Sequence, residues 1–212
     1  MKKIFFLLCA AALLFSFSKP GSSYPFDKWD AATMEKANSA KDATGYSDEE
    51  KKVVYYCNLA RLNPDLFYKT FVAHYLDSTK AKATSFTRSL QSDLTSRYKP
   101  MEILTIKQDL TDEAVDHAND SGKSGVIGHF TSDNKSYDFR MKKFKGVYKT
   151  TVENCDYGYK DGLSIVIHQL IDEGQATIEH RKAILDKNLK FAGVSIQQHK
   201  KEKWTCVIDF GN

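Results

Sequence analysis

Three residues in short, distinctive contexts combine side-chain types that bind a divalent metal ion. They are His129 in G-H-F, Glu153 in V-E-N and His180 in E-H-R. Each stands at the edge of an expected helix or strand, where functional groups tend to lie. Two imidazoles and a carboxylate are ligands that hold zinc or a similar ion while leaving a position for water.

Each of these residues also has a structural interpretation. His129 could cap a helix end, Glu153 could form buried hydrogen bonds, and His180 could pair with Glu179. Other signatures of catalysis are absent: the sequence has no G-x-S-x-G elbow, no H-E-x-x-H helix and no glycine-rich phosphate loop. No serine or cysteine stands with a histidine at a spacing that nominates a nucleophile.

Three expected elements position the candidate residues. The segment D-L-T-D-E-A-V-D-H-A-N-D-S-G reads as a helix that ends at Gly122, shortly before His129. The segment T-V-E-N-C-D-Y-G, from residue 151, reads as a strand that carries Glu153. A short helix through E-H-R-K-A-I-L carries His180.

The remaining elements define the fold class. A capping box, S-D-E-E at Ser47, starts a helix that Asn63-Pro64 closes, and a second helix follows through L-F-Y-K-T-F-V-A-H-Y-L. Residues 79–99 are expected to form a loop and a short helix, and D-G-L-S-I-V-I-H-Q-L-I-D-E-G is a strongly amphipathic helix. The segments F-A-G-V-S-I-Q-Q and W-T-C-V-I-D-F-G read as a hairpin. The pattern predicts an α+β domain, mostly helical, with a small antiparallel sheet.

The chain begins like a secreted protein. Residues 1–18 carry two lysines, an apolar run too short to span a bilayer, and small residues suited to cleavage, so they are expected to be a Sec-type signal peptide. Residues 19–46 are expected to be an N-terminal extension, wrapped on the domain or partly loose, and residues 47–212 one domain. No later segment is apolar enough to cross a membrane, so we expect a secreted, periplasmic or cell-surface protein.

Charge and cysteine content narrow the partners further. Loss of Lys2 and Lys3 with the signal removes two of the four net positive charges, and the remainder is too small to favour a nucleic-acid partner. The mature chain keeps Cys57, Cys155 and Cys206, and spacing alone does not choose a disulfide pair. We expect Cys155 and Cys206 on neighbouring strands, bridged or as buried thiols, and Cys57 buried in the first helix.

The ordered series of motifs resembles a known family. The run L-T-D-E-A-V-D-H-A-N-D-S-G-K-S-G-V-I-G-H-F-T-S-D, then Arg140, V-E-N, E-H-R-K-A-I-L, G-V-S-I and W-T-C-V-I-D-F-G, is similar to bacterial members of the CAP superfamily, whose domain is also called SCP. The resemblance covers roughly residues 47–212, and N-S-A-K with N-L-A-R-L-N-P-D-L-F is similar to versions from the Bacteroidetes. It implies a three-layer α-β-α sandwich.

The resemblance also implies a central cleft faced by two histidines and two acidic residues, in which the histidines bind a divalent metal. The histidines correspond to His129 and His180, and the first acid to Glu153. The second acid falls on Asp172 or Glu173. At about 100° per residue, Asp172 is expected to point to water and Glu173 to border the apolar face, so Glu173 is the predicted cleft residue.

The sequence departs from the family pattern beside two of these residues. Glu179 replaces the usual small residue before His180, and Cys155 replaces an aliphatic residue after E-N. A carboxylate beside His180 would raise its basicity or supply an alternative ligand. His117 is expected to be a helix-packing residue. The remaining histidines are expected to be surface or packing residues: His74, His168 and His199.

Three functions are consistent with this sequence. The favoured one is an extracellular binding module that presents the metal-capable cleft of His129, Glu153, Glu173 and His180 to a lipid-like molecule, a peptide or a glycan. The alternative is a metal-assisted secreted hydrolase or protease, with zinc or another divalent cation on the histidines and Glu153 as general base. A structural component of the envelope or matrix is the third.

Overall fold

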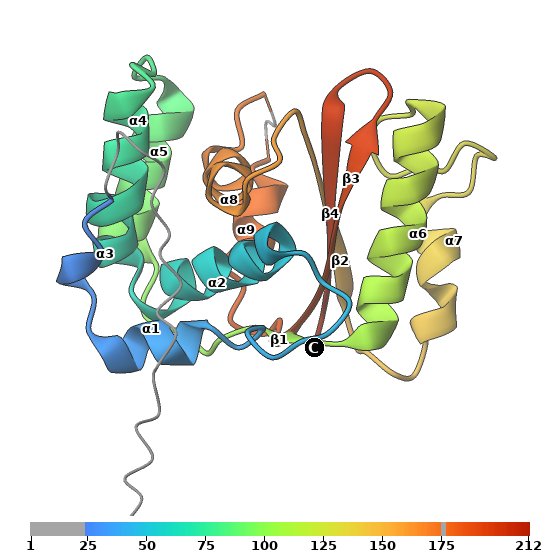
Figure 1. The fold of residues 1–212 in the computed structure, drawn as a ribbon, viewed down its shortest axis with the longest axis horizontal. Coiled ribbons are helices and arrows are strands. Elements are labelled where there is room, and N and C mark those ends of the chain that lie inside the picture. Colours follow the sequence, from blue (N-terminus) through green and yellow to red (C-terminus); the bar gives the residue numbers. More distant parts are fainter. Residues whose placement is uncertain (1–23, 175–176) are drawn as a thin grey trace, which may run out of the picture.

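The computed structural model describes residues 24–174 and 177–212, which form three layers (Figure 1). Helices α6 and α7 cover one face of a four-stranded sheet, and α2, α8 and α9 cover the other (Figure 1). This arrangement confirms the predicted α+β class and the α-β-α sandwich. The bounds of the covering helices are Asp48–Leu62 (α2), Gln108–Ser124 (α6), Tyr137–Met141 (α7), Gly162–Ile171 (α8) and Glu179–Ile184 (α9).

The sheet has the order β1-β3-β4-β2. Its centre is the predicted hairpin, in which β3 pairs antiparallel with β4, and β2 extends it antiparallel on the other side of β4. The short strand β1 pairs parallel with β3, so the sheet is mixed and not purely antiparallel. Strand β2 forms an edge of the sheet. The strand bounds are Thr105–Ile106 (β1), Thr151–Tyr157 (β2), Phe191–His199 (β3) and Lys203–Gly211 (β4).

Local sequence explains the ends of the helices on both faces. The predicted capping box starts α2, because the Ser47 side chain accepts from the Glu50 amide while the Glu50 carboxylate accepts from the Ser47 amide. Helix α6 continues past the predicted end to Ser124, and Gly125 closes it with a φ of 78°. Gly122 instead lies inside the helix against β3, where a Cβ would stand 2.3 Å from the Gln198 carbonyl oxygen.

An outer layer of helices lies beyond α8 and α2 (Figure 1). The predicted second helix is a continuous run with one π-helical turn, and the expected short helix also ends in a π-helical turn. Such turns accommodate one extra residue in a helix. The segments are η1 (Phe26–Lys28), α1 (Ala31–Ala37), α3 (Pro64–Phe67), η2 (Tyr68–Val72), α4 (Ala73–Ser78), α5 (Ser85–Ser92), η3 (Asp93–Arg97) and, on the α7 side, η4 (Lys142–Phe144).

Residues 24–46 pack onto the rest of the molecule. Trp29, Ala37 and Ala40 are buried in the main core, and the Trp29 indole donates to the Thr70 hydroxyl. The boundary at Ser47 stays a prediction, and the expected signal peptide lies outside the described residues. No helix in the described ranges is both long and apolar enough to cross a membrane.

Two buried guanidinium groups tie the helical layers together. Arg61 on α2 is fully buried and its three nitrogens donate to backbone carbonyl oxygens at 2.7 to 3.0 Å. Arg181 on α9 is equally buried and pairs with Asp93 at 2.9 Å. Buried polar groups of this kind are stable only when they are hydrogen-bonded. The acceptors of Arg61 are Glu102, Ile184, Asp186 and Leu189.

The three described cysteines are free and buried. Cys155 and Cys206 lie on neighbouring strands, as predicted, and Cys57 is buried in α2. The register pairs Cys155 with Val207 and Cys206 with Asp156, so the two thiols are offset by one residue. Because successive strand residues point to opposite faces, Cys155 faces α6 while Cys206 lies in the main core.

Candidate functional site

Glu153 lies at the centre of a buried network on the α6 face of β2. Its side chain is only 1% exposed. Arg140 donates to both of its carboxylate oxygens, at 2.7 and 2.8 Å, and Nδ1 of His129 lies 2.8 Å from Oε1. Burial favours the protonated acid, but the hydrogen bond with His129 and the charge and hydrogen bonds of Arg140 lower the pKa of Glu153. The network therefore holds Glu153 as a carboxylate.

Helix α7 positions Arg140. The Ser136 side chain caps this helix by accepting from the Phe139 amide. Arg140 then donates through Nη1 to Glu113 at 2.6 Å and through Nη2 to the His129 carbonyl oxygen at 3.2 Å. Lys143 also contacts Glu113. Arg140 thus links the loop that carries His129 to helix α6 and strand β2.

His117 completes the inner side of this network, in addition to its predicted packing role on α6. Its side chain is fully buried, and Nε2 lies 3.0 Å from the Gly128 carbonyl oxygen and 3.8 Å from Oε1 of Glu153. Burial lowers the pKa of His117, which favours a neutral ring. A carbonyl oxygen only accepts, so Nε2 carries the proton and donates to Gly128.

His180 contacts a different carboxylate from the one predicted. Its Nδ1 lies 2.9 Å from Oδ1 of Asp172, and its backbone amide donates to Oδ2 of the same residue at 2.9 Å. Asp172 is buried and Glu173 is exposed, so the prediction that Asp172 points to water is wrong. Helix α8 ends at Ile171, and Asp172 adopts a left-handed conformation with φ 57°. A helical projection therefore does not apply to either residue. Glu179 contacts Lys182.

The two predicted histidines flank edge strand β2 from its two faces. His129 contacts Glu153 on the α6 face. The next residue, Asn154, points the other way and donates to the His180 carbonyl oxygen at 3.1 Å. Convergence of both rings in one cleft stays a prediction.

A third histidine–carboxylate pair, on the α8 face, was missed by the sequence analysis. Nδ1 of His168 lies 2.5 Å from Oδ1 of buried Asp156. The hydrogen bond with Asp156 raises the pKa of His168, and burial raises the pKa of Asp156. The only indication of this pair in the sequence was the acidic residue Asp156 at an inward-facing position of the predicted strand.

Asp209 on β4 is a further acidic residue that the sequence analysis missed. It pairs with Glu153 across the β2–β4 ladder and is fully buried. Neither of its carboxylate oxygens has a hydrogen-bond partner among residues 24–174 and 177–212. Burial, together with the negative charges of Glu153 and Glu113, raises its pKa well above the usual range. These effects favour the protonated form of Asp209.

The geometry restricts the chemistry of this site. Cys155 Sγ lies 3.7 Å from Nδ1 of His129, the same nitrogen that faces Glu153. In a nucleophilic triad the nucleophile and the orienting acid bind different ring nitrogens, so these three residues do not form one. The Nε2 atoms of His129 and His180 have no protein partner identified in the described ranges, since the carboxylates occupy Nδ1. A carboxylate behind an imidazole is the usual support of a metal-ligating histidine.

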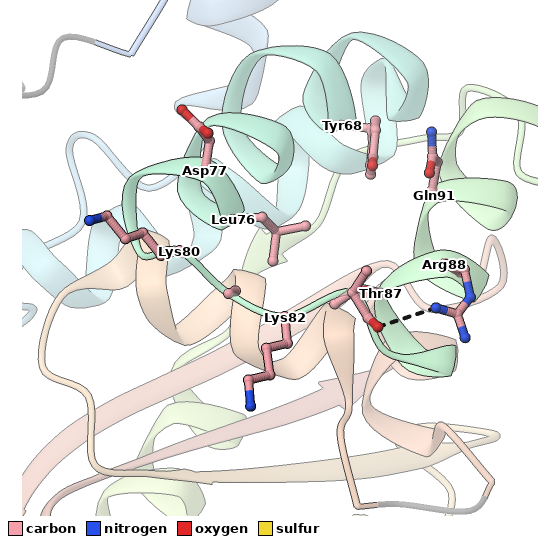
Figure 2. Close-up of a pocket in the computed structure, with 10 residues that line it drawn as sticks. Tyr68, Leu76, Asp77, Lys80, Lys82, Thr87, Arg88 and Gln91 are labelled. Atoms are coloured by element: carbon pink, nitrogen blue, oxygen red, sulfur yellow. Dashed lines mark hydrogen bonds between the residues drawn. The ribbon is translucent and has the colours of Figure 1, made fainter.

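A surface pocket of about 450 Å³ lies between α4 and α5 (Figure 2). Figure 2 shows Lys80 and Lys82 extending in different directions and away from Arg88 on α5. The cations therefore do not converge on one ligand position, and the pocket is a weaker candidate than the histidine–carboxylate network. Its lining residues are Tyr68, Leu76, Asp77, Lys80, Ala81, Lys82, Ala83, Thr87, Arg88 and Gln91.

The three-layer fold places the protein among the small α-β-α sandwich domains. The sequence model of the CAP family, described as the cysteine-rich secretory protein family, matches residues 54–208. The chain belongs to this family. None of the curated proteins compared with the chain matched it.

Solved structures of bacterial proteins show a similar but distant fold. An outer surface protein from Borrelia burgdorferi is 19% identical, with a TM-score of 0.43 over 53% of this chain and 79% of its own. An extracellular SCP-domain protein from Bacillus anthracis str. Ames is 16% identical, with a TM-score of 0.43 over 66% of this chain and 49% of its own. A cysteine-rich secretory protein from Staphylococcus aureus subsp. aureus Mu50 is 18% identical, with a TM-score of 0.39 over 59% and 36%.

Proposed function

We propose that this protein is a secreted CAP-domain binding module. Its cleft is lined by His129, Glu153 and His180, with Glu173 at the rim, and its ligand is a lipid-like molecule with a polar head. Asp172 orients His180 through its contact with Nδ1 of the ring. Family membership supports an extracellular role, while the ligand class rests on the exposed side chains around His129.

The salt bridge between Glu153 and Arg140 is the observation that carries a binding role over catalysis. A general base works best when its pKa lies near the pH at which the enzyme operates. Both oxygens of Glu153 already accept from Arg140, and Oε1 also faces His129. Because this salt-bridged carboxylate has a lowered pKa, it is also a weak base.

Apolar side chains beside His129 favour a lipid-like ligand over a glycan. Ile127 is 54% exposed and Phe130 is 51% exposed, in the same loop as the 46% exposed ring of His129. Apolar surface left in water beside a polar group suits a ligand with an apolar chain and a polar head. A peptide with an apolar side chain would use the same surface.

A divalent ion on His129 and His180, as the family implies, is compatible with their surroundings. Nδ1 of His129 is hydrogen-bonded to Glu153, and Nδ1 of His180 lies 2.9 Å from Asp172, so Nε2 of each ring is left to bind the ion. Such an ion would supply Lewis acidity to a bound polar head. The residues of this chain orient the two rings and exclude water from their carboxylates.

Binding of a fluorescent long-chain fatty acid to the secreted protein tests this proposal. We expect Phe130→Ser to weaken binding about tenfold, because the ring would lose its burial against the acyl chain. Val147→Ser is the matched control, since Val147 is an exposed apolar residue distant in sequence from His129. Equal affinities for the two variants, or no binding by the wild type, would contradict a lipid-binding cleft.

The same preparation tests the hydrolase alternative. Metal-dependent hydrolysis by the wild-type protein, abolished by chelator and by Glu153→Gln but retained by Glu173→Gln, would replace the binding module by an enzyme. We expect no turnover that depends on Glu153.

A further inference from the structure

Four potential metal ligands come together on the α6 face of the sheet. His117 lies in α6, His129 follows that helix in the loop, and Glu153 and Cys155 are two residues apart on β2, so both point toward α6. Ligand atoms of His117, Glu153 and Cys155 lie within 4.8 Å of one another. Nδ1 of His129 lies 2.8 Å from Glu153 and 3.7 Å from Cys155 Sγ.

We propose that His117, His129, Glu153 and Cys155 form a closed zinc site on the inner side of edge strand β2. This site does not use His180. It shares His129 and Glu153 with the proposed cleft, and because it places the His129 proton on Nε2, it is an alternative to an ion held by His129 and His180. The ligands of this site are two imidazoles, one carboxylate and one thiolate, and zinc binds all of these ligand types in tetrahedral sites.

Two of the separations between these atoms suit a tetrahedral ion. Zinc bonds of about 2.0 to 2.3 Å place neighbouring ligand atoms roughly 3.3 to 3.8 Å apart. The distances from Cys155 Sγ to His129 Nδ1 (3.7 Å) and from His117 Nε2 to Glu153 Oε1 (3.8 Å) fall in this range. The 2.8 Å contact between His129 and Glu153 is a hydrogen bond, and it lengthens when the ion replaces the proton.

Zinc binding releases only one proton from this site. When zinc binds a neutral His129, the Nδ1 proton moves to Nε2 of the same ring. In His117 the Nε2 proton moves to Nδ1, which is buried without a partner in the described part of the chain. Only the Cys155 thiol then releases a proton, and its sulfur lone pair forms the bond with zinc. The hydrogen bond from His117 to the Gly128 carbonyl is exchanged for the metal bond.

Asp209 provides an independent indication that a cation is accommodated here. It faces Glu153 across the ladder, is fully buried, and neither of its carboxylate oxygens is hydrogen-bonded within the described residues. Buried polar atoms without partners are rare and often mark the place of an ion or water. Arg140 donates to both carboxylate oxygens of Glu153 and so fixes its orientation, as second-shell partners of metal ligands do.

Titration of the metal-free protein with Co²⁺, followed by absorption, tests the site. We expect a thiolate-to-cobalt charge-transfer band and the intense visible bands of tetrahedral Co²⁺, with one proton released per ion and displacement by Zn²⁺. Cys155→Ser should abolish the charge-transfer band, and His117→Gln should lower Zn²⁺ affinity about 100-fold. Circular dichroism of both metal-free variants checks that they are folded.

Two matched variants separate this site from the alternatives. Cys206→Ser removes the buried thiol on the opposite face of the sheet and should leave the charge-transfer band unchanged. His180→Ala should also leave it unchanged. Cobalt binding without a thiolate band, or a band that survives Cys155→Ser, would overturn the proposal. So would loss of the band in His180→Ala. Fatty-acid affinity, measured separately, reports on the proposed function and not on this site.

Discussion

At the scale of single residues, the ion pair between Arg140 and Glu153 has the largest energetic consequence. Both side chains are at most 7% exposed, and removal of Glu153 leaves the poorly solvated Arg140 with Glu113 as its remaining carboxylate partner in the described residues. Glu153→Gln should lower the free energy of unfolding by about 3 kcal/mol in urea denaturation. Glu173→Gln, at an exposed position, should change it by less than about 0.5 kcal/mol. Equal effects would mean that the pair contributes little.

The buried carboxyl group of Asp209 makes the free energy of unfolding depend on pH. Its pKa is raised in the folded state, so above the unfolded value of about 3.9 the folded protein binds more protons than the unfolded protein. Asp209 therefore lowers the free energy of unfolding progressively as pH rises from about 4 through the pKa that this residue has in the folded state. Asp209→Asn removes that contribution. Urea denaturation in chelator should show the variant gaining stability relative to wild type from pH 5 to pH 8, and parallel pH profiles would contradict this assignment.

At the scale of elements, the helices and strands with strong local signals could be predicted. Helix α2 has its capping box, α8 its apolar stripe, and the β3–β4 hairpin its alternating apolar residues. The side chain of Asp172 could not be placed from a helical projection, because the chain leaves α8 just before it in a left-handed conformation. The π-helical turns also have no comparable local signal.

The candidate site was predictable only in part, for a related reason. The contact between His129 and Glu153 joins two of the residues carried over from the family. Arg140 was quoted only as part of the resemblance, and Asp209 was not singled out at all. Their partners lie on other elements, so their roles depend on tertiary pairing and strand register that no local pattern specifies.

Packing of α6 against β3 depends on a glycine. A Cβ on Gly193 would lie 2.2 Å from backbone atoms of Leu110 and Thr111. Gly193→Ala should therefore push α6 away from the sheet and cost about 3 kcal/mol or more in unfolding free energy. Gly158→Ala is the control, because its Cβ would meet open space and only its φ of 92° is unfavourable, at about 1 kcal/mol. A smaller loss for Gly193→Ala than for Gly158→Ala would contradict this close approach.

At the scale of the whole molecule, Arg61 joins segments that are far apart in the sequence. Its guanidinium donates to four carbonyl oxygens, one near β1, one at the last residue of α9 and two after α9. A lysine has one nitrogen and would leave some of these acceptors unpaired, so Arg61→Lys should cost about 3 kcal/mol in thermal or urea unfolding. Arg97→Lys, with a 68% exposed side chain, should cost less than about 0.5 kcal/mol. Similar losses for both variants would count against a joining role.

The one-residue offset between Cys155 and Cys206 makes each thiol a probe of a different layer. Cys155 packs against α6, whereas Cys206 packs in the core beneath α2 and α8. Because both are buried, an alkylating reagent reaches each sulfur only when the helices that cover it move away. The alkylation rates of Cys155 and Cys206, measured by peptide mass spectrometry, would therefore report separately how fast each face of the sheet opens. No substitution in the chain is needed for this measurement.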